Sequence, residues 1–365
     1  MNFRNNKISS HQLTLLIIVY IIGDAILVLP SITASEAKQD AWIAAIFSVT
    51  IGMIIVLFYY AVSRLYPDLT LVEYSKKILG KWPGMFVSLL FLSYTFLYSA
   101  VALREIGDFM TTQIMPDTPI QSILILFAII VFMATRLGLE TIARSAEIMF
   151  PCVFLLLLIL VISLIPQMKF ENVQPIMEGG FKPIARASLT FITYPFVELV
   201  LFLMFFPYVN EKKRIKNSLF AGAFLGGLVL IIVTTLSILV LGADQTANQQ
   251  YPSYKLARKI NIANFFTRVE AILAIIWFIT IFFRLTISFY ITCFGLAQTL
   301  NLKEYSQLVY PLGMIMIVLS LIISPNIVSI SNLNSIWPFF DFTYGILLPL
   351  LLVCIALVRR RFKWL

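Results

Sequence analysis

The sequence predicts an all-α integral membrane protein of ten transmembrane helices, arranged as a five-plus-five inverted repeat in which helices 1 and 6 are broken. Composition is the first observation, because 60% of the 365 residues are hydrophobic and only 12% are charged, whereas soluble domains average about 45–50% and about 25%. The second is a series of ten continuous apolar stretches of helix length. The third is an interruption in the first and the sixth stretch, which is typical of secondary transporters.

These stretches, numbered here as spans 1 to 10, fill most of the chain. They lie at about 12–33, 41–63, 85–112, 118–135, 146–165, 187–208, 218–242, 263–297, 306–323 and 335–358. Five helices per half is an odd number, so the second half enters the membrane from the opposite side, which predicts two repeats, 12–165 and 187–358. Loops 166–186 and 243–262 are too short to fold alone. Residues 1–365 are therefore expected to form one membrane domain, with these loops as solvated connectors or lids.

The distribution of basic residues predicts the orientation. With the N-terminus placed in the cytoplasm, seventeen lysines and arginines fall on inner segments and eight on outer segments. This excess, which includes the RRRFK tail after span 10, predicts a multi-pass protein with both termini cytoplasmic. The net charge of +9 is scattered over short loops and does not indicate a nucleic-acid partner.

The sequence contains few residues that could support catalysis or metal binding. The single histidine, His11, lies near the N-terminus, and the three cysteines lie separately inside apolar runs. A catalytic triad, a histidine-based metal site and a disulfide framework are therefore not expected. We predict that the chain is not an enzyme and needs no metal or cofactor.

The interruptions of spans 1 and 6 are the candidate site. Span 1 reads LLIIVYIIGDAILVLP, and its central Gly23 and Asp24 are weak helix residues that invite unwinding. In span 6, Pro195 removes a backbone hydrogen bond and Glu198 follows within a turn. Half-helix termini exposed in this way suit the two charges of an amino acid zwitterion. The alternative is a plain proline kink together with a packing glycine.

Seven ionisable residues fall inside the spans, where each is unfavourable unless it is paired or faces water. They are Asp24, Arg104, Glu105, Asp108, Glu198, Arg284 and Asp341. Arg104 and Asp108 are four apart and can pair on one helix face, whereas Glu105 needs another partner. Glu198, Asp24 and Glu105 remain alternative partners for the central Arg284. Asp341, near a helix end, is interpreted as reaching to the interface.

Small and aromatic residues give weaker indications. The aromatic residues of span 3, Tyr94, Phe96 and Tyr98, either line a small-molecule pocket or, more commonly, face lipid or the core. Gly222 and Gly226 in span 7 are four apart, a pattern that predicts close helix packing rather than ligand contact.

Several segments taken together resemble one family. They are YPDLTLVEYSKKILGKWPG (66–84), TPIQSI (118–123), GLETIARSAEIMFP (138–151), NVQPIMEGGFKPIARAS (172–188), FVELVLFLMFFPYVNEKKR (196–214) and TRVEAILAIIW (267–277). In this order and without large gaps, the chain resembles the B subunits of nutrient germinant receptors in endospore-forming bacteria. That family belongs to the amino acid–polyamine–organocation superfamily, whose LeuT-like inverted-repeat fold agrees with the fold predicted above.

The resemblance implies a receptor subunit in the inner membrane of the dormant spore. It would bind a nutrient, often an amino acid, and act with a larger membrane A subunit and a lipoprotein C subunit. Where the family commonly has Gly-x-Gly in helix 1, this chain has Gly23-Asp24-Ala25, while Glu198 matches an acid of helix 6. Arg268, Glu270 and Trp277 match the helix 8 motif and are interpreted as structural or gating residues.

The predicted ligand-binding residues come from spans 1, 3, 6 and 8. They are Gly23, Asp24, Ala25, Tyr98, Glu105, Tyr194, Pro195, Glu198 and Arg284. Our first hypothesis is a germinant-sensing subunit that passes a conformational change to its partners. The second is a proton- or cation-coupled amino acid transporter with Asp24 and Glu198 as coupling groups. The third is an ion-conducting pore, for which one chain offers few acidic residues.

Overall fold

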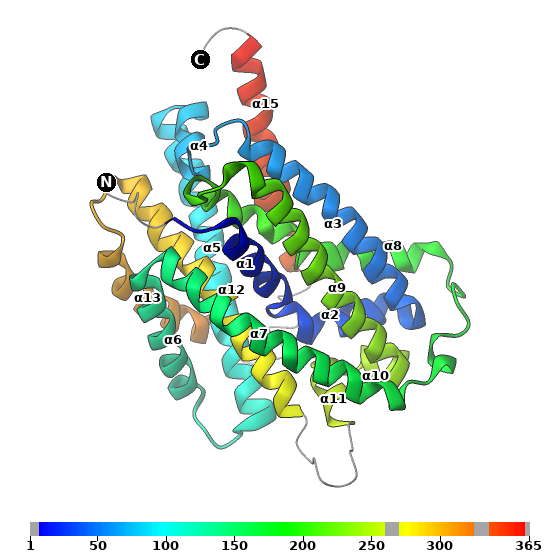
Figure 1. Ribbon diagram of the computed structural model, residues 1–365. Coiled ribbons are helices and arrows are strands. Elements are labelled where there is room, and N and C mark those ends of the chain that lie inside the picture. The colour runs from blue at the N-terminus through cyan, green and yellow to red at the C-terminus, as the bar shows by residue number, and fades with distance from the viewer. Residues whose placement is uncertain (1–6, 260–269, 325–335, 362–365) are drawn as a thin grey trace.

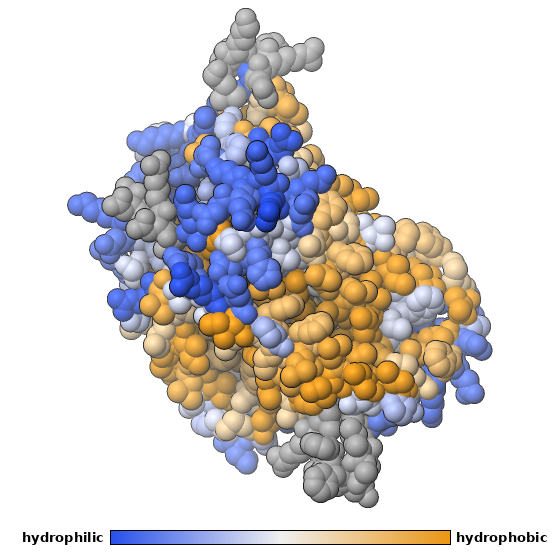
Figure 2. Space-filling model, in the orientation of Figure 1, coloured by the Kyte–Doolittle hydropathy of each residue, from blue (hydrophilic) through white to orange (hydrophobic). Residues whose placement is uncertain are grey.

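The computed structural model describes residues 7–259, 270–324 and 336–361, and the regular elements of these ranges are all helices (Figure 1). Eight helices are long and apolar enough to cross a membrane, and two shorter apolar helices, Ser10–Ile22 and Ser306–Ile322, accompany them. The ten predicted spans are therefore all present as helices. On the face drawn in Figure 2, an apolar surface crosses the middle of the molecule and polar residues gather toward the top.

The elements follow the order of the predicted spans. Spans 1 to 5 are α1 (Ser10–Ile22) with α2 (Ala25–Ala37), α3 (Ala41–Ser63), α5 (Lys81–Phe109) with η3 (Met110–Ile114), α6 (Ile120–Leu137) and α7 (Leu139–Leu164). Spans 6 to 10 are α8 (Phe181–Thr193) with η6 (Val197–Met204), α9 (Ile215–Leu241), α12 (Glu270–Leu300), α13 (Ser306–Ile322) and residues 336–341 with η9 (Phe342–Leu347) and α15 (Leu348–Arg361). The connections contain α4 (Leu71–Leu79), α10 (Ala243–Ala247), α11 (Pro252–Arg258) and the short turns η2 (Lys38–Asp40), η4 (Ile165–Gln167), η5 (Phe170–Val173), η7 (Phe206–Tyr208) and η8 (Lys212–Arg214).

Local sequence signals explain where several helices begin and end. Ser9 and Gln12 form a reciprocal capping box at the start of α1, and Thr70 and Glu73 form another at the start of α4. The backbone of Gly80 has a positive φ of 95° between α4 and α5, which a residue with a Cβ adopts only with strain. These caps satisfy backbone groups that the helix ends leave open.

The interior of the bundle is formed by the interrupted spans and their neighbours. The most apolar part of span 6 is 89% buried and that of span 8 is 72% buried, whereas the figures for spans 4 and 5 are 33% and 22%. α1 packs against α9, α12 and α7, and α12 packs against α5. Spans 1, 3, 6 and 8 therefore surround a common centre, and spans 4 and 5 present apolar side chains to the surroundings.

The observed helices differ from the predicted stretches mainly at their ends. α7 begins at Leu139 rather than at 146, because its polar first turns remain helical and hold the ion pair between Glu140 and Arg144, at 2.6 Å. α5 and α8 likewise begin several residues before their apolar stretches. Residues 263–269 at the start of predicted span 8 lie outside the described residues. The repeat boundaries, 12–165 and 187–358, stay a prediction.

The two glycines of span 7 pack as predicted. A Cβ added at Gly222 would lie 2.8 Å from Ile17, and one added at Gly226 would lie 2.7 Å from Ile21. Such distances are too short for real side chains, so only glycine allows α9 to approach α1 this closely.

Candidate functional site

Span 1 is interrupted where the sequence predicts. α1 ends at Ile22, and the Gly23 amide donates to the Val19 carbonyl at 3.1 Å. A Cβ at position 23 would lie 2.3 Å from the Arg284 side chain, so glycine is required for this close approach. α2 then begins at Ala25, with Asp24 between the two half-helices.

Span 6 changes its helical form at the predicted break. α8 ends at Thr193, and the chain continues through Tyr194, Pro195 and Phe196 into η6, a 3₁₀ helix of eight residues. Because proline has no amide hydrogen, the regular hydrogen-bond ladder cannot continue through this segment. The carbonyl of Tyr194 instead accepts a hydrogen bond from Arg284, at 3.1 Å.

Arg284 of α12 joins the two breaks. Its guanidinium forms ion pairs with Asp24 at 2.6 Å and with Glu198 at 2.5 Å. The contact with Asp24 is an ion pair without the alignment of a hydrogen bond, whereas the contact with Glu198 is an aligned hydrogen bond. Among the partners that the sequence left open, Asp24 and Glu198 are therefore both paired with Arg284.

The same guanidinium also reaches backbone carbonyls at the ends of both first half-helices. It donates to the Tyr20 carbonyl at 3.2 Å, in addition to the Tyr194 carbonyl, and its Nε donates to the Tyr98 hydroxyl. C-terminal helix carbonyls carry partial negative charge and favour a cation. Arg284 therefore occupies a cation-binding position formed by two carbonyls and two carboxylates.

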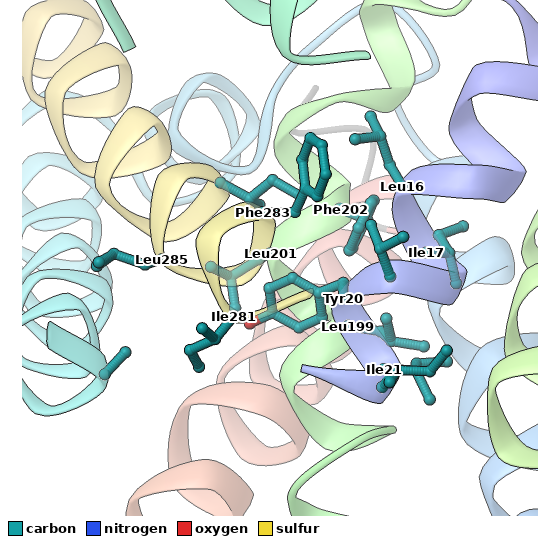
Figure 3. Close-up of a cluster of buried hydrophobic side chains, with 14 of the residues drawn as sticks. Leu16, Ile17, Tyr20, Ile21, Leu199, Leu201, Phe202, Ile281, Phe283 and Leu285 are labelled. Carbon is teal, nitrogen blue, oxygen red and sulfur yellow. The ribbon is translucent and has the colours of Figure 1, made fainter. Parts of the chain in front are cut away.

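Tyrosine rings enclose this cation. The Arg284 Cζ lies 5.0 Å from the centre of the Tyr20 ring and 5.3 Å from that of Tyr98, distances typical of cation–π contacts. The Tyr20 hydroxyl also donates to Glu198 at 3.3 Å. Figure 3 shows Tyr20 between α1, span 6 and α12, with Leu199 and Ile281 close to it. The sequence did not single out Tyr20, because a tyrosine within an apolar run carries no sign of its neighbours.

The eight predicted site residues other than Arg284 fall into three groups. Five of them contact Arg284 directly, namely Asp24, Tyr98, Tyr194, Glu198 and the close-packed Gly23. Ala25 and Pro195 lie at the breaks themselves. Glu105 does not contact the guanidinium, although it interacts electrostatically with Asp24, Arg284 and Asp108. The structure thus places these residues around one centre, and ligand binding by them stays a prediction.

Two further sequence interpretations have clear outcomes. Arg104 and Asp108 pair with each other at 3.0 Å as predicted, and both are buried. The interpretation of Asp341 as an interfacial residue is wrong, because its carboxyl is fully buried and accepts a hydrogen bond from Tyr94 at 2.8 Å. Its position near the end of an apolar stretch was misleading, since Asp341 itself contacts Tyr94 in the middle of α5.

Aromatic residues close the centre on the side of α11. The Phe109 ring lies 4.6 Å from that of Trp277 and 5.2 Å from those of Tyr251 and Tyr254. A cavity of about 320 Å³ lies on the α11 side and is lined by Gln113, Gln249, Gln250, Tyr251, Tyr254, Lys255, Arg258 and Lys259. The Ser253 hydroxyl donates to the Ile26 carbonyl at 2.6 Å, which holds α11 against α2. The described part of loop 243–262 thus packs along α2, the second half of span 1. Arg268 lies outside the described residues.

The two interrupted helices and the helical bundle around them indicate a class of membrane protein, the one with the LeuT-like transporter fold. MhsT, solved in complex with L-phenylalanine, matches with a TM-score of 0.72 at 15% identity, over 97% of this chain and 89% of that chain. Mhp1, a nucleobase-cation-symport-1 family transporter solved in a closed conformation with bromovinylhydantoin bound, matches with a TM-score of 0.71 at 13% identity, over 98% and 80%. These likenesses confirm the predicted fold, including the inverted repeat and broken helices 1 and 6.

The chain belongs to the family of spore germination proteins, whose model matches residues 7–328. It is similar to spore germination protein KB of Bacillus subtilis (strain 168), with 29% identity over 360 residues, 97% of this chain and 96% of that protein. It is also similar to spore germination protein XB of Bacillus anthracis, with 23% identity over 290 residues, 79% and 80% of the two chains. The resemblance to germinant-receptor B subunits, predicted from the sequence, is therefore confirmed.

Proposed function

We propose that this protein is the germinant-sensing membrane subunit of a spore nutrient receptor, which binds a small nutrient, an amino acid, at the breaks of spans 1 and 6. It acts in the spore inner membrane with both termini cytoplasmic, and it signals to A and C subunits to start germination. The observation that carries the proposal is the Arg284 network, in a chain of the spore germination family, that joins both breaks. Ligand binding at the breaks would change how the two half-helices of each interrupted span are oriented relative to each other.

The chemistry of the breaks suits an amino acid. Its carboxylate would approach the N-terminal end of α2, where helix amides favour an anion. Its ammonium would compete with Arg284 for the carbonyls of Tyr20 and Tyr194 and for the Glu198 carboxylate. The ligand ammonium and Arg284 therefore bind the same acceptors in two different conformations of the protein. Ligand binding shifts the population from one conformation to the other.

The transporter remains the second candidate because the fold is shared with transporters, one of them described as a Na⁺-coupled sialic acid symporter. In that function Asp24 and Glu198 would bind the coupling proton or cation as well as the substrate amine. Uptake of a labelled amino acid into vesicles that contain the purified chain, with a dependence on an imposed proton or sodium gradient, distinguishes transport from sensing alone.

The test of the sensing function is a germination profile over a nutrient panel. Spores would lack this chain, carry Glu198→Gln, or carry the control Glu140→Gln, which alters an exposed carboxylate on α7. We expect loss of the response to one nutrient class in the first two strains and a normal response in the control. Unaltered germination with reduced vegetative amino acid uptake would instead support the transporter.

A further inference from the structure

A further buried acid, Asp341, lies next to the turn η9 that packs on span 6, and it forms no ion pair with Arg284. Asp341 is fully buried, its Oδ1 accepts the hydrogen bond from Tyr94, and its Oδ2 has no hydrogen-bond partner in the described part of the chain. Aromatic rings surround it, since Tyr94 stacks on Tyr344 with ring centres 4.9 Å apart and on Trp337 at 6.4 Å.

This acid lies deep in the bundle. Its partner Tyr94 is the fourteenth of the 29 residues of α5, so Asp341 is level with the middle of a helix that crosses the whole bundle. None of the ion pairs between described residues involves Asp341. An unpaired carboxylate at this depth would be strongly unfavourable, because neither water nor a paired cation replaces its hydration.

The favourable charge that interacts with Asp341, that of Arg284, is already shared with other acids. Arg284 already faces two carboxylates, Asp24 and Glu198, so one positive charge is set against two negative charges before Asp341 is counted. Glu198 and Asp341 interact electrostatically, and a further negative charge there would be repelled. Besides Tyr94 of α5, which contacts Asp341 directly, the groups that interact with it electrostatically come from several packed elements. They are Tyr59 of α3, Tyr194 and Glu198 of span 6, Arg284 of α12 and Asp24 of span 1.

The available oxygens suit a proton better than a metal cation. Calcium requires about six to eight oxygen ligands and magnesium about six, whereas the Asp341 carboxyl has one hydroxyl, that of Tyr94, in contact. The nearby carbonyls of Val197 and Gly345 are engaged, because the Tyr59 hydroxyl lies 2.6 Å and 3.0 Å from them and donates between them. Within the described ranges no group of three or more acidic, histidine or cysteine residues is arranged for a metal.

The position of Asp341 links it to span 6. It directly precedes η9, a π-helical turn, and such turns are frequent at functional sites. Gly345 of η9 packs so closely on Val197 that an added Cβ would lie 2.3 Å from its side chain, and Tyr59 connects both backbones. A rearrangement of η6 would therefore displace the turn that Asp341 begins.

We propose that Asp341 is a proton-binding site, whose carboxyl holds a proton in this conformation and exchanges it when span 6 and η9 move together. The Tyr94 hydroxyl fixes the carboxyl, and Tyr59 transmits the state of the span 6 break to η9. This proposal goes beyond ligand sensing, because proton binding at Asp341 holds whether the chain senses or transports its ligand.

Infrared spectroscopy of the purified full chain in lipid nanodiscs at neutral pH tests the proposal directly. A protonated carboxylic acid has a carbonyl stretching band that an ionised carboxylate lacks. We expect this band in the wild type and in Glu140→Gln, whose altered side chain is exposed and paired with Arg144, and its loss in Asp341→Asn. Retention of the whole band in Asp341→Asn, with loss of carboxylate absorption instead, would overturn the proposal.

A second variant keeps the test decisive if Asp341→Asn does not fold. Tyr94→Phe retains the carboxyl but removes its hydrogen-bond partner, so the acid band should move to higher frequency without loss of intensity. A spectrum of Tyr94→Phe without any shift in that region would show that the band does not arise from Asp341. Because germination is not the readout, failure of the receptor function and failure of the proton site are distinguishable.

Discussion

Replacement of Arg284 by glutamine should destabilise the protein strongly. The Arg284 side chain is 0% exposed, and its partners Asp24 and Glu198 are 7% and 1% exposed. Removing one partner of a buried ion pair costs about 3–5 kcal/mol, because the remaining charge is left unpaired in a medium of low polarity. The substitution leaves two carboxylates and two helix-end carbonyls without the guanidinium, so we expect a loss of at least about 3 kcal/mol.

The matched control is Arg144→Gln on α7. Arg144 pairs with Glu140 at 2.6 Å, but the two side chains are 68% and 36% exposed. Exposed pairs contribute about 0.2–1 kcal/mol because water screens them. Arg284→Lys should be intermediate, since it keeps the charge but lacks the planar fork of donors that reaches all of these acceptors.

Unfolding by a denaturing detergent, followed through tryptophan fluorescence, gives the free energies of the variants under one condition. In the double variant Arg284→Gln with Glu198→Gln, one orphaned charge is removed, so the two substitutions should couple by about 0.5–3 kcal/mol. If Arg284→Gln is as stable as Arg144→Gln, or if the double variant shows no coupling, the guanidinium does not anchor the breaks and the reasoning is wrong.

Three further predictions concern the ligand and the packing. Asp24→Gly should shift the nutrient preference toward simple neutral amino acids, because the additional negative charge is lost, and an identical nutrient profile would show that Asp24 is only structural. Gly226→Leu should destabilise the fold by about 1–3 kcal/mol through overlap with Ile21, so an unchanged unfolding curve would contradict the packing. Hydrogen bonds from Ser10 lower the pKa of Glu211 below its ordinary 4.5, so this contact stabilises the fold above that pH and is lost as the pH falls through the lowered pKa. In Ser10→Ala the pKa of Glu211 is lowered less, so the variant should lose less stability on acidification, and a superimposable pH profile would refute the link.

The sequence was most informative where a local rule acts along the chain. Apolar stretches of helix length identified the spans because a bilayer requires them, and Gly23 and Pro195 marked the breaks because both residues weaken a helix locally. The partner of Arg284 could not be chosen, because the choice depends on three helices meeting in space. In the structure Arg284 pairs with both Asp24 and Glu198. This arrangement requires the close approach of the Arg284 side chain to span 1 that Gly23 permits.

Depth in the bundle was the least predictable property. Asp341 lies near the beginning of its apolar stretch, yet it is buried beside the middle of α5. Hydropathy gives a residue's distance from the end of its own helix, whereas burial depends on how that helix is placed against its neighbours. The same limitation concealed Tyr20, whose importance comes from the carboxylate and guanidinium around it.

The close contact between α1 and α9 gives the break of span 1 a mechanical consequence. α1 packs most extensively on α9, through Gly222 and Gly226, whereas α2 packs most extensively on α8 and α10 and also contacts α9 and α11. The two half-helices therefore have different main packing partners on either side of Gly23. Gly226 lies eleven residues from the start of α9 at Ile215, or about 16 Å at 1.5 Å per residue. If α1 and α9 tilted together by about 10° about the contact at Gly226, the start of α9 would move by about 3 Å. A small change at the break of span 1 could in this way reach the polar end of the bundle.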